Sequence, residues 1–510
     1  MNSKIRKDLR IFATLAVAVI VVQFFISLES YPHDLYVQFD STWYFMCGKA
    51  WMNGLMPYVD FADSKGPLLW LIFGIAYLFS PHTFLGVYWM TCLFYTVTLF
   101  FVYKTATIFL QTRREAILVS IVMMVILLDK AIRNDVHTED FTLTFFAISL
   151  YFTCRALYVK QASPVCSAFW IGLSIGAALL VKFTAAAMLV VFALSVLCKA
   201  RRTRSQLLRA VLSMASGFGV IVLPFVAYFL LNGTLRAFLH EYFVQTFVTT
   251  QGADPWFNTR VLLSSLPNLI TLVLVVPGLL LISRMLKSYR WFPLIAFAWI
   301  YLLSVPNGWI NYLIPVNLLA VFTVVFLVRI FDLRCLPAWC DGIFVALMLM
   351  FVVGTNVWLH DFRHPDTGTF FTQNNRLRQQ FYAYEYVMAQ VPRSRVVYCG
   401  GVPPVYGICS DALPACKYFA RQYGATDEML EDQWRTVSER KADFVVAQRR
   451  NHDVARRALA AGYRSFYYPV CPQEDFILYC KRDFRQPPHY LNITNWDVLL
   501  KRNPDFVRMR

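Results

Sequence analysis

Hydrophobic and polar positions alternate along the chain in long blocks. Eleven apolar segments are separated by polar loops, and each has the length, or nearly the length, of a helix that crosses a bilayer. Their approximate bounds are residues 11–28, 84–103, 115–129, 140–158, 166–181, 184–198, 208–231, 262–282, 291–305, 309–328 and 341–360. The pattern predicts a polytopic α-helical membrane protein with about 11 to 13 spans.

A further apolar run, residues 67–80, is too short to be a straight span. It holds about 13 apolar residues, whereas a span needs about 20. If this run crossed the membrane, every later loop would change sides and the Arg-rich loops would face outward. We therefore predict an interfacial or re-entrant helix here.

Lys and Arg residues are distributed unevenly among the loops. They are frequent in loops 104–114, 199–207 and 283–290, and sparse for the loop length in 29–66, 130–139, 232–261 and 306–308. The positive-inside rule places the first set in the cytoplasm and the second set outside. The basic start MNSKIRKDLR is followed by an apolar segment without a small-residue cleavage site, which predicts an uncleaved first span and a cytoplasmic N-terminus.

Eleven crossings from a cytoplasmic N-terminus leave the C-terminus outside. We predict a transmembrane module at residues 1–360, with a first outer loop at 29–83, and a small extracytoplasmic α/β domain at residues 361–510. In the latter, sequence patterns predict helices at 376–391, 426–441 and 452–463 and strands at 395–401, 442–448 and 476–481.

Five of the twelve cysteines lie in this C-terminal region, without a CxxC or histidine pattern for zinc. In an oxidising compartment Cys409 could pair with Cys416 across a short loop, and Cys471 with Cys480. Cys399 would then remain as a single thiol. The sequence does not fix the connectivity.

Composition supports a membrane protein. Of 510 residues, 58% are hydrophobic and 15% are charged, whereas a soluble domain has about a quarter charged. The net charge is 48 − 31 = +17. Because the basic residues are scattered among apolar spans, nucleic-acid binding is a poor interpretation of that charge.

Unusual polar residues collect in the predicted outer loops. The stretch FADSKGPLLW places Asp63 and Lys65 directly before the short apolar run, and DKAIRNDVHTED forms the second outer loop. Lys182 interrupts the apolar stretch ALLVKFTAA, and PNGWINY follows a later span. Ionisable groups at a membrane boundary are costly, and they are candidates for a functional site.

The segment FDSTWYFMCGKAWMNGLMPYVDFADSKGPLLWLI resembles the first outer loop of GT-C glycosyltransferases. The similarity is to their protein-mannosyltransferase and aminoarabinose-transferase-like branch, a family 39-like group. It rests on Asp40, Tyr44, the motif GLMPYVD (54–60) and the motif DSKGPL (63–68). The later segments VKFTA and INYLIPV are also similar, with Asn311 in place of the usual histidine. The resemblance covers roughly residues 11–330, and the tail is only loosely alike.

The resemblance implies an integral-membrane transferase with a GT-C-like fold. Such an enzyme moves a hexosyl or pentosyl group from a polyprenyl-phosphate donor to a lipid, glycan or protein acceptor, with no nucleic-acid partner. It implies an inner-membrane protein that acts at the outer face. It also places an acidic residue of the second outer loop toward the donor, for which we select Glu139.

Asp40 and Lys65 are candidates for the two central roles in that reaction. Asp40 would accept the proton of the attacking group as a general base, although a helix cap for STWYFM is the simpler interpretation. Lys65 would stabilise the donor phosphate at the N-terminus of the helix at 67–80. The simpler interpretation is a lysine whose stem lies along the bilayer surface.

The remaining candidates are weaker. Asp63 and Asp60 would orient Lys65 or bind a metal, or Asp60 merely ends a turn. His137, Glu139 and Asp140 open a helix, where acidic residues often only complement the dipole. With His137 the carboxylate pair could also bind a divalent cation; no cofactor is certain and the metal is unassigned.

Two further groups complete the candidate site. Lys182 would meet the phosphate or a carboxylate, or would mark a short outer loop, and Arg133 is an alternative phosphate ligand. Asn311 and Tyr312 would line the cavity, or lie in an aromatic belt at the bilayer surface.

Two other classes of function compete with an enzyme. A transporter or flippase also places charges in a membrane, but such proteins often show two related halves with matched broken helices, and we find none in the sequence. A receptor whose tail binds a partner would leave the charges of the first outer loop without a role.

Overall fold

The computed structural model describes residues 3–27, 29–30, 39–128, 137–250, 254–331, 337–363, 376–402, 404–420, 425–466 and 476–485. The chain divides into two compact units. Unit 1 comprises Met1–Ile26, Thr91–Tyr228 and Asp254–Leu359, and unit 2 comprises Ser27–Met90, Phe229–Ala253 and His360–Arg510. Much of the segment 29–83, which was predicted as the first outer loop, therefore groups with the C-terminal residues. The division into domains at residues 1–360 and 361–510 stays a prediction.

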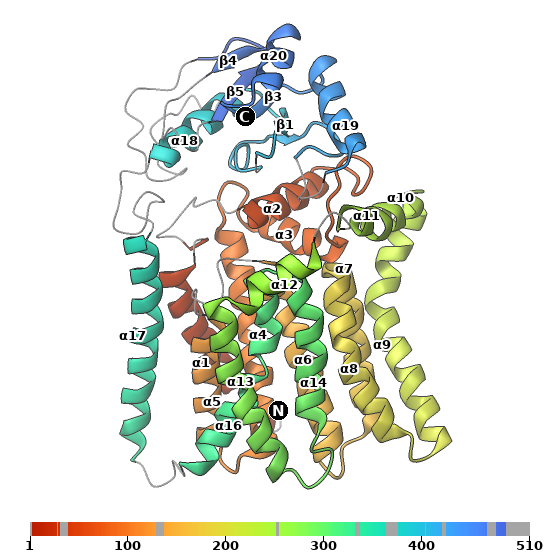
Figure 1. Cartoon of the computed structure of the whole chain (residues 1–510), viewed down its shortest axis with the longest axis vertical. Helices are drawn as coiled ribbons and strands as arrows, with labels where there is room; N and C mark the ends of the chain where they lie inside the picture. The colour runs from red at the N-terminus through yellow and green to blue at the C-terminus, as the bar shows by residue number, and fades with distance from the viewer. Residues whose placement is uncertain are drawn as a thin grey trace. The chain divides into compact units, whose positions relative to one another are not determined.

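Unit 1 is a bundle of helices (Figure 1). In it, α6 packs against α7 and α8, and α13 packs against α16. Its long helices are α1 (Ser3–Ile26), α4 (Leu85–Phe109), α5 (Arg113–Leu128), α6 (Thr138–Tyr158), α7 (Pro164–Val181), α8 (Phe183–Ala200), α9 (Arg204–Leu231), α13 (Leu266–Met285), α14 (Phe292–Ser304), α16 (Ala320–Ile330) and α17 (Ala338–Arg363). Shorter pieces are α12 (Pro255–Leu263), η3 (Val305–Asn307), η4 (Ile310–Leu313) and α15 (Ile314–Asn317).

A helix occupies each of the eleven segments predicted to cross the membrane. Among the described residues, seven helices are long and apolar enough to span a bilayer, or eight if Ile310–Asn317 and Ala320–Ile330, bent by 43°, form one broken span. The predicted segments 115–129 and 291–305 become helices of 16 and 13 residues. The polytopic helical class is thus confirmed.

Helix packing in unit 1 depends on small residues. Helix α7 begins at Pro164, where the Ser163 hydroxyl accepts a hydrogen bond from the Cys166 amide at 3.5 Å. Halfway along it, a Cβ on Gly172 would lie 2.0 Å from the Met214 carbonyl oxygen of α9. Glycine at this position therefore allows the two backbones to approach closely.

The first part of unit 2 is built from helices α2 (Phe39–Met52) and α3 (Pro67–Phe79), and from α10 (Leu235–Leu239), η2 (His240–Gln245) and α11 (Thr246–Thr250). Helix α3 is the short apolar helix predicted for residues 67–80, with 13 residues. It packs closely on α2, because a Cβ on Gly48 would lie 2.4 Å from the Gly74 amide nitrogen.

The second part of unit 2 is a small α/β domain (Figure 1). Its helices and strands are α18 (Arg376–Met388), α19 (Asp427–Ser438), α20 (His452–Ala460), β1 (Arg395–Cys399), β2 (Leu413–Pro414), β3 (Phe444–Gln448), β4 (Arg464–Phe466) and β5 (Phe476–Cys480). The sheet has the order β2-β1-β3-β5-β4. Strands β2 and β3 run parallel to β1, whereas β5 is antiparallel to its neighbours β3 and β4. The three helices and three strands predicted from the sequence are confirmed.

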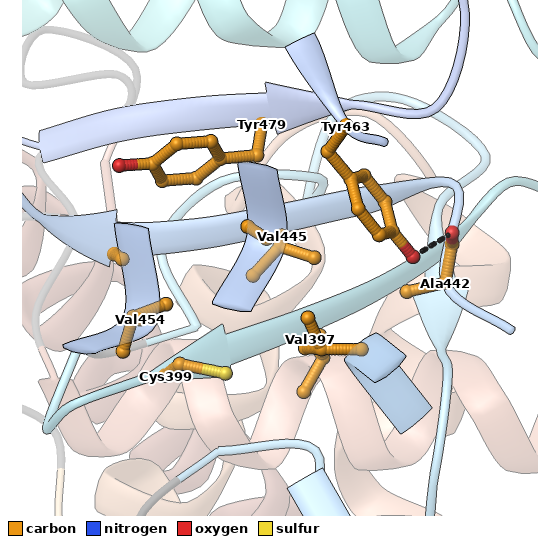
Figure 2. Packing of buried hydrophobic residues seen from close by; sticks show 10 residues of the cluster. Val397, Cys399, Ala442, Val445, Val454, Tyr463 and Tyr479 are labelled. Atoms are coloured by element: carbon orange, nitrogen blue, oxygen red, sulfur yellow. Dashed lines mark hydrogen bonds between the residues drawn. The ribbon is translucent and has the colours of Figure 1, made fainter. Parts of the chain in front are cut away.

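The core of this domain lies against the sheet. Figure 2 shows Val397 and Cys399 of β1 beside Val445 of β3, with Val454 of α20 in the same cluster. The buried Tyr463 extends the cluster, and its hydroxyl donates a hydrogen bond to the Ala442 carbonyl at 2.8 Å. The polar end of the tyrosine is thereby satisfied inside an apolar core.

The predicted disulfide between Cys409 and Cys416 is wrong. Neither these cysteines nor Cys399 and Cys480 form a disulfide, and Cys471 lies outside the described residues. Strand β2 lies between Cys409 and Cys416 and extends the chain along β1. Cys416 is half-buried, with its thiol beside Asp432 and Thr436, and the loss of solvent around the thiol raises its pKa well above the usual value.

Candidate functional site

Helix α2 places two of the candidate residues on one face. Asp40 lies in the first turn and Tyr44 follows four residues later, a spacing that brings two side chains together on a helix. Asp40 is half-buried and Tyr44 is buried. The Tyr44 ring packs on Phe73 of α3 with centroids 5.5 Å apart. Helices α2 and α3 thus fix the position of the Tyr44 ring, which lies near the Lys65 ammonium.

The segment Asp63–Ser64–Lys65 forms a short polar relay before α3. The Asp63 carboxylate accepts hydrogen bonds from the Ser64 amide at 2.6 Å and the Ser64 hydroxyl at 3.2 Å. The Lys65 ammonium donates to the Ser64 hydroxyl at 2.9 Å and lies 5.9 Å from the centroid of the Tyr44 ring. Asp63 therefore contacts Lys65 through Ser64.

Burial raises the pKa of Asp63 above its ordinary value. The positive charge of Lys65 and the Ser64 amide oppose this shift, and the negative charge of Asp40 adds to it. The influence of Asp40 places two carboxylates and one ammonium in the same small region. A buried carboxylate whose pKa is shifted by neighbouring charges is characteristic of functional sites.

We expect Asp63→Asn to stabilise the protein at neutral pH. A carboxylate whose pKa is higher in the folded state favours folding only while it is protonated, and that contribution is lost as pH rises through the folded-state pKa. Asparagine removes this loss. The thermal midpoint of the variant should therefore exceed that of the wild type at pH 7, and the difference should vanish below about pH 3.9.

The matched control is Asp453→Asn, because Asp453 is an exposed carboxylate paired with Arg456 on α20. That variant should unfold within a degree or so of the wild type, as surface substitutions usually do. A lower midpoint for Asp63→Asn at pH 7 would contradict the expectation.

Asp60 makes the turn contact that was one of its predicted roles. Its carboxylate accepts a hydrogen bond from the Met56 amide at 2.7 Å, which closes an exposed turn. Helix α3 begins seven residues later, with Gly66 at its N-cap and Pro67 in the first turn. The N-terminus of this 13-residue helix follows Lys65 directly, and unsatisfied amides at such an end favour an anion.

The second set of candidates lies in unit 1. The Lys182 ammonium is 2.5 Å from a carboxylate oxygen of Glu139, at the start of α6, and 3.8 Å from the centroid of the Tyr312 ring. Lys182 is the single residue between α7 and α8. The sequence predicted a phosphate or a carboxylate as the partner of Lys182, and in the structure its partner is the carboxylate of Glu139.

His137 and Asp140 form the cap of α6. The Asp140 carboxylate accepts hydrogen bonds from the His137 amide at 2.7 Å and from the Tyr95 hydroxyl of α4. Thr138 donates to the second oxygen of Glu139 at 2.9 Å. Asp140 therefore fixes the start of the helix, and Glu139 is aimed at Lys182.

The other candidates receive less support. Asn311 is half-buried beside Tyr312 on η4, and Arg133 lies outside the described residues. Within the described part of the chain, no group of three or more His, Cys, Asp and Glu side chains is placed to hold a metal ion. The divalent cation considered for His137 stays unassigned.

Several contributing residues were not identified in the sequence. Ser64 lies between Asp63 and Lys65, which were both candidates, and this position in the motif could have identified it. Lys49 of α2 is buried, and its ammonium donates to the carbonyls of Gly407 at 2.8 Å, Ile408 at 3.2 Å and Ser410. No local pattern marks such a residue, because its partners lie more than 350 residues away.

Comparison with known proteins finds a family model that matches part of the chain and solved structures that share its fold. Residues 65–231 match the family model of dolichyl-phosphate-mannose-protein mannosyltransferase. This range includes Lys65, Glu139 and Lys182 and ends before Asn311. No curated protein gives a significant match.

Solved structures match over nearly the whole chain. ArnT from Cupriavidus metallidurans bound to undecaprenyl phosphate matches with a TM-score of 0.60 at 13% identity, covering 94% of this chain and 99% of that one. Its apo state gives 0.59 at 12% identity, with 94% and 98% covered. Arabinofuranosyltransferase AftD from Mycobacteria gives 0.50 at 10% identity, with 92% of this chain and 40% of that chain covered. The resemblance to the mannosyltransferase and ArnT-like branch of the GT-C superfamily is confirmed, and the chain has the GT-C fold.

Proposed function

We propose that the protein is a membrane glycosyltransferase that transfers a hexosyl or pentosyl group from a polyprenyl-phosphate donor to a lipid, glycan or protein acceptor. The observation that carries the proposal is the Asp63–Ser64–Lys65 relay at the N-terminus of α3, with Asp40 close enough to perturb Asp63. A cation and a helix N-terminus recognise a phosphate, and a nearby carboxylate serves as a base. The mannosyltransferase family match and the ArnT fold support a polyprenyl-linked donor.

Lys65 is assigned to the donor phosphate. Among the described residues its ammonium contacts a hydroxyl and an aromatic ring and forms no ion pair within 4.0 Å, so no carboxylate touches it directly. Lys182, by contrast, already has Glu139 as its partner. We therefore assign Lys182 to the support of Glu139, which the resemblance places toward the donor.

The proposed reaction proceeds by one displacement at the anomeric carbon. A hydroxyl oxygen of the acceptor forms a bond to this carbon, and Asp40 takes the hydroxyl proton. The bond from the anomeric carbon to the phosphate oxygen breaks, and the lipid phosphate leaves with the electron pair. Lys65 stabilises the negative charge that grows on that oxygen.

The reaction is placed at the outer face of the inner membrane. Lys and Arg are frequent in the loops at 104–114, 199–207 and 283–290, which the positive-inside rule assigns to the cytoplasm. With the N-terminus in the cytoplasm, the first outer loop and the C-terminal α/β domain lie outside. This orientation is part of the proposal.

The test is donor consumption by the purified protein in nanodiscs. A panel of polyprenyl-phosphate hexoses and pentoses with labelled sugars is incubated with envelope extract from a strain that lacks the gene. We expect one donor to release polyprenyl phosphate and to transfer its label to an extractable acceptor. Lys65→Ala should bind donor more weakly and turn over more slowly, because the contact exists before and during bond breaking.

Lys441→Ala is the matched control, because Lys441 is an exposed lysine paired with Glu439. It should act like the wild type. Failure of every donor in the panel, with well-folded protein, would refute the proposal.

A further inference from the structure

We propose that Glu241 of η2 is a positioning residue that holds the loop carrying Asp63 and Lys65. The inference rests on the proposed role of Lys65 as the ligand of the donor phosphate. It concerns contacts within unit 2, between the polar segment before α3, the helices that follow α9, and the C-terminal domain.

The carboxylate of Glu241 is buried and has two partners from the C-terminal domain. The Lys417 ammonium lies 2.5 Å from one of its oxygens, and the Tyr418 hydroxyl donates to the other at 2.9 Å. Charge-assisted hydrogen bonds of this kind are about twice as strong as neutral ones. Glu241 therefore fixes the backbone of Lys417 and Tyr418.

That backbone in turn binds the loop. The Lys417 carbonyl accepts a hydrogen bond from the Ala62 amide at 2.9 Å, one residue before Asp63. Ala62 and Tyr418 also share an apolar cluster with Met429 of α19. Glu241 is therefore connected through Lys417 to Ala62, the residue before Asp63.

The residue after Glu241 supports the loop from its other end. The buried Tyr242 ring stacks on Phe238, and Phe238 packs on Tyr58 with centroids 5.2 Å apart. The Tyr58 hydroxyl donates to the Lys65 carbonyl at 3.0 Å. Tyr58 has φ 67°, which is unusual for an aromatic residue and requires a surrounding structure that imposes it.

A π-helical turn brings these two contacts together. Residues His240–Gln245 form η2, between α10 and α11. In a π-helix successive side chains are re-aimed relative to an α-helix, and such turns are frequent at functional sites. Here Glu241 and Tyr242, adjacent in the chain, act on the two ends of the segment from Ala62 to Lys65.

The experiment compares Glu241→Gln with Glu439→Gln in nanodiscs. Glu439 pairs with Lys441 at the same 2.5 Å on an exposed surface, so the chemical change is identical. We measure amide exchange of residues 61–66 without ligand, and the binding of labelled polyprenyl phosphate. Glu241→Gln should accelerate the exchange and raise the dissociation constant about tenfold. Glu439→Gln should change neither.

A double-mutant cycle with Lys65→Ala separates positioning from general stability. In the Lys65→Ala background, Glu241→Gln should weaken binding less than twofold, because the loop then positions no cation. A residue that acts only on stability would give equal losses in both backgrounds. Equal losses, or unchanged exchange in Glu241→Gln, would overturn the proposal.

Failure of the proposed function has a different signature. If Lys65→Ala alone binds polyprenyl phosphate like the wild type, the phosphate assignment is wrong. Exchange is measured without ligand, so it still decides whether Glu241 holds the loop. If Glu241→Gln does not fold, Tyr418→Phe removes one hydroxyl from the same carboxylate and should change exchange in the same direction.

Discussion

Replacement of Asp40 by asparagine should lower sugar transfer by a factor of about 10² to 10⁴, the contribution typical of a general base. Asparagine has nearly the same shape as aspartate but does not accept the proton of the attacking hydroxyl. Asp40 is half-buried in the first turn of α2, and its charge acts on Asp63. Turnover and thermal unfolding would be measured together in nanodiscs.

Two comparisons make this result specific. Asp453→Asn removes an exposed carboxylate and should transfer sugar at the wild-type rate. Asp63→Asn should slow transfer less than Asp40→Asn, because Asp63 orients Lys65 through Ser64 and does not contact the proton. Near-normal turnover of Asp40→Asn would leave it with the role of a helix cap.

Replacement of Lys49 by methionine should destabilise unit 2 by about 3–5 kcal/mol, the cost of removing one partner from buried charges. Three carbonyls lose their donor. Glu385, which is buried and accepts hydrogen bonds from the Ile408 and Ser410 amides at 2.8 Å, also loses the charge that opposes the rise of its pKa. Thermal unfolding in nanodiscs measures the loss.

The loss should depend on pH. Burial raises the pKa of Glu385 in the folded protein, so its contribution to stability falls as pH rises through that folded-state value. Without Lys49 the pKa rises further. The defect of Lys49→Met should therefore be largest at neutral pH and shrink toward about pH 4.3, the ordinary value for glutamate.

Adding Glu385→Gln to Lys49→Met should restore part of the stability at neutral pH. Lys441→Met, at an exposed position, should have little effect. A Lys49→Met protein as stable as the wild type at pH 7 would show that the carbonyls and Glu385 do not depend on the ammonium.

Features that depend on nearby residues could be predicted from the sequence. Asp63 and Lys65 stand out because they precede an apolar run that is too short to cross the membrane. The helices and strands of the C-terminal domain follow from their hydrophobic periodicity. Lys182 was expected to need an anionic partner, because a charge between two apolar segments is costly.

Features that depend on distant residues could not be predicted. The sequence did not show that the partner of Lys182 is Glu139, because the two residues are 43 positions apart. Lys49 resembles an ordinary lysine near a helix end until the C-terminal domain covers it. The predicted disulfide between Cys409 and Cys416 was wrong because strand β2 lies between them. Their short separation in the sequence does not show that the backbone between them is extended.

The contacts of Lys49 also constrain how the protein is made. The ammonium and its first carbonyl partner are separated by 358 residues. At synthesis rates of about 5–20 residues per second, the lysine waits roughly 20 to 70 s for the acceptors that satisfy it. During that interval Lys49 has none of these carbonyl acceptors, and a chain that stops before residue 407 never supplies them. We therefore expect chains that end before residue 407 to be less stable around α2 than the 510-residue chain, because the buried Lys49 ammonium lacks these carbonyl partners.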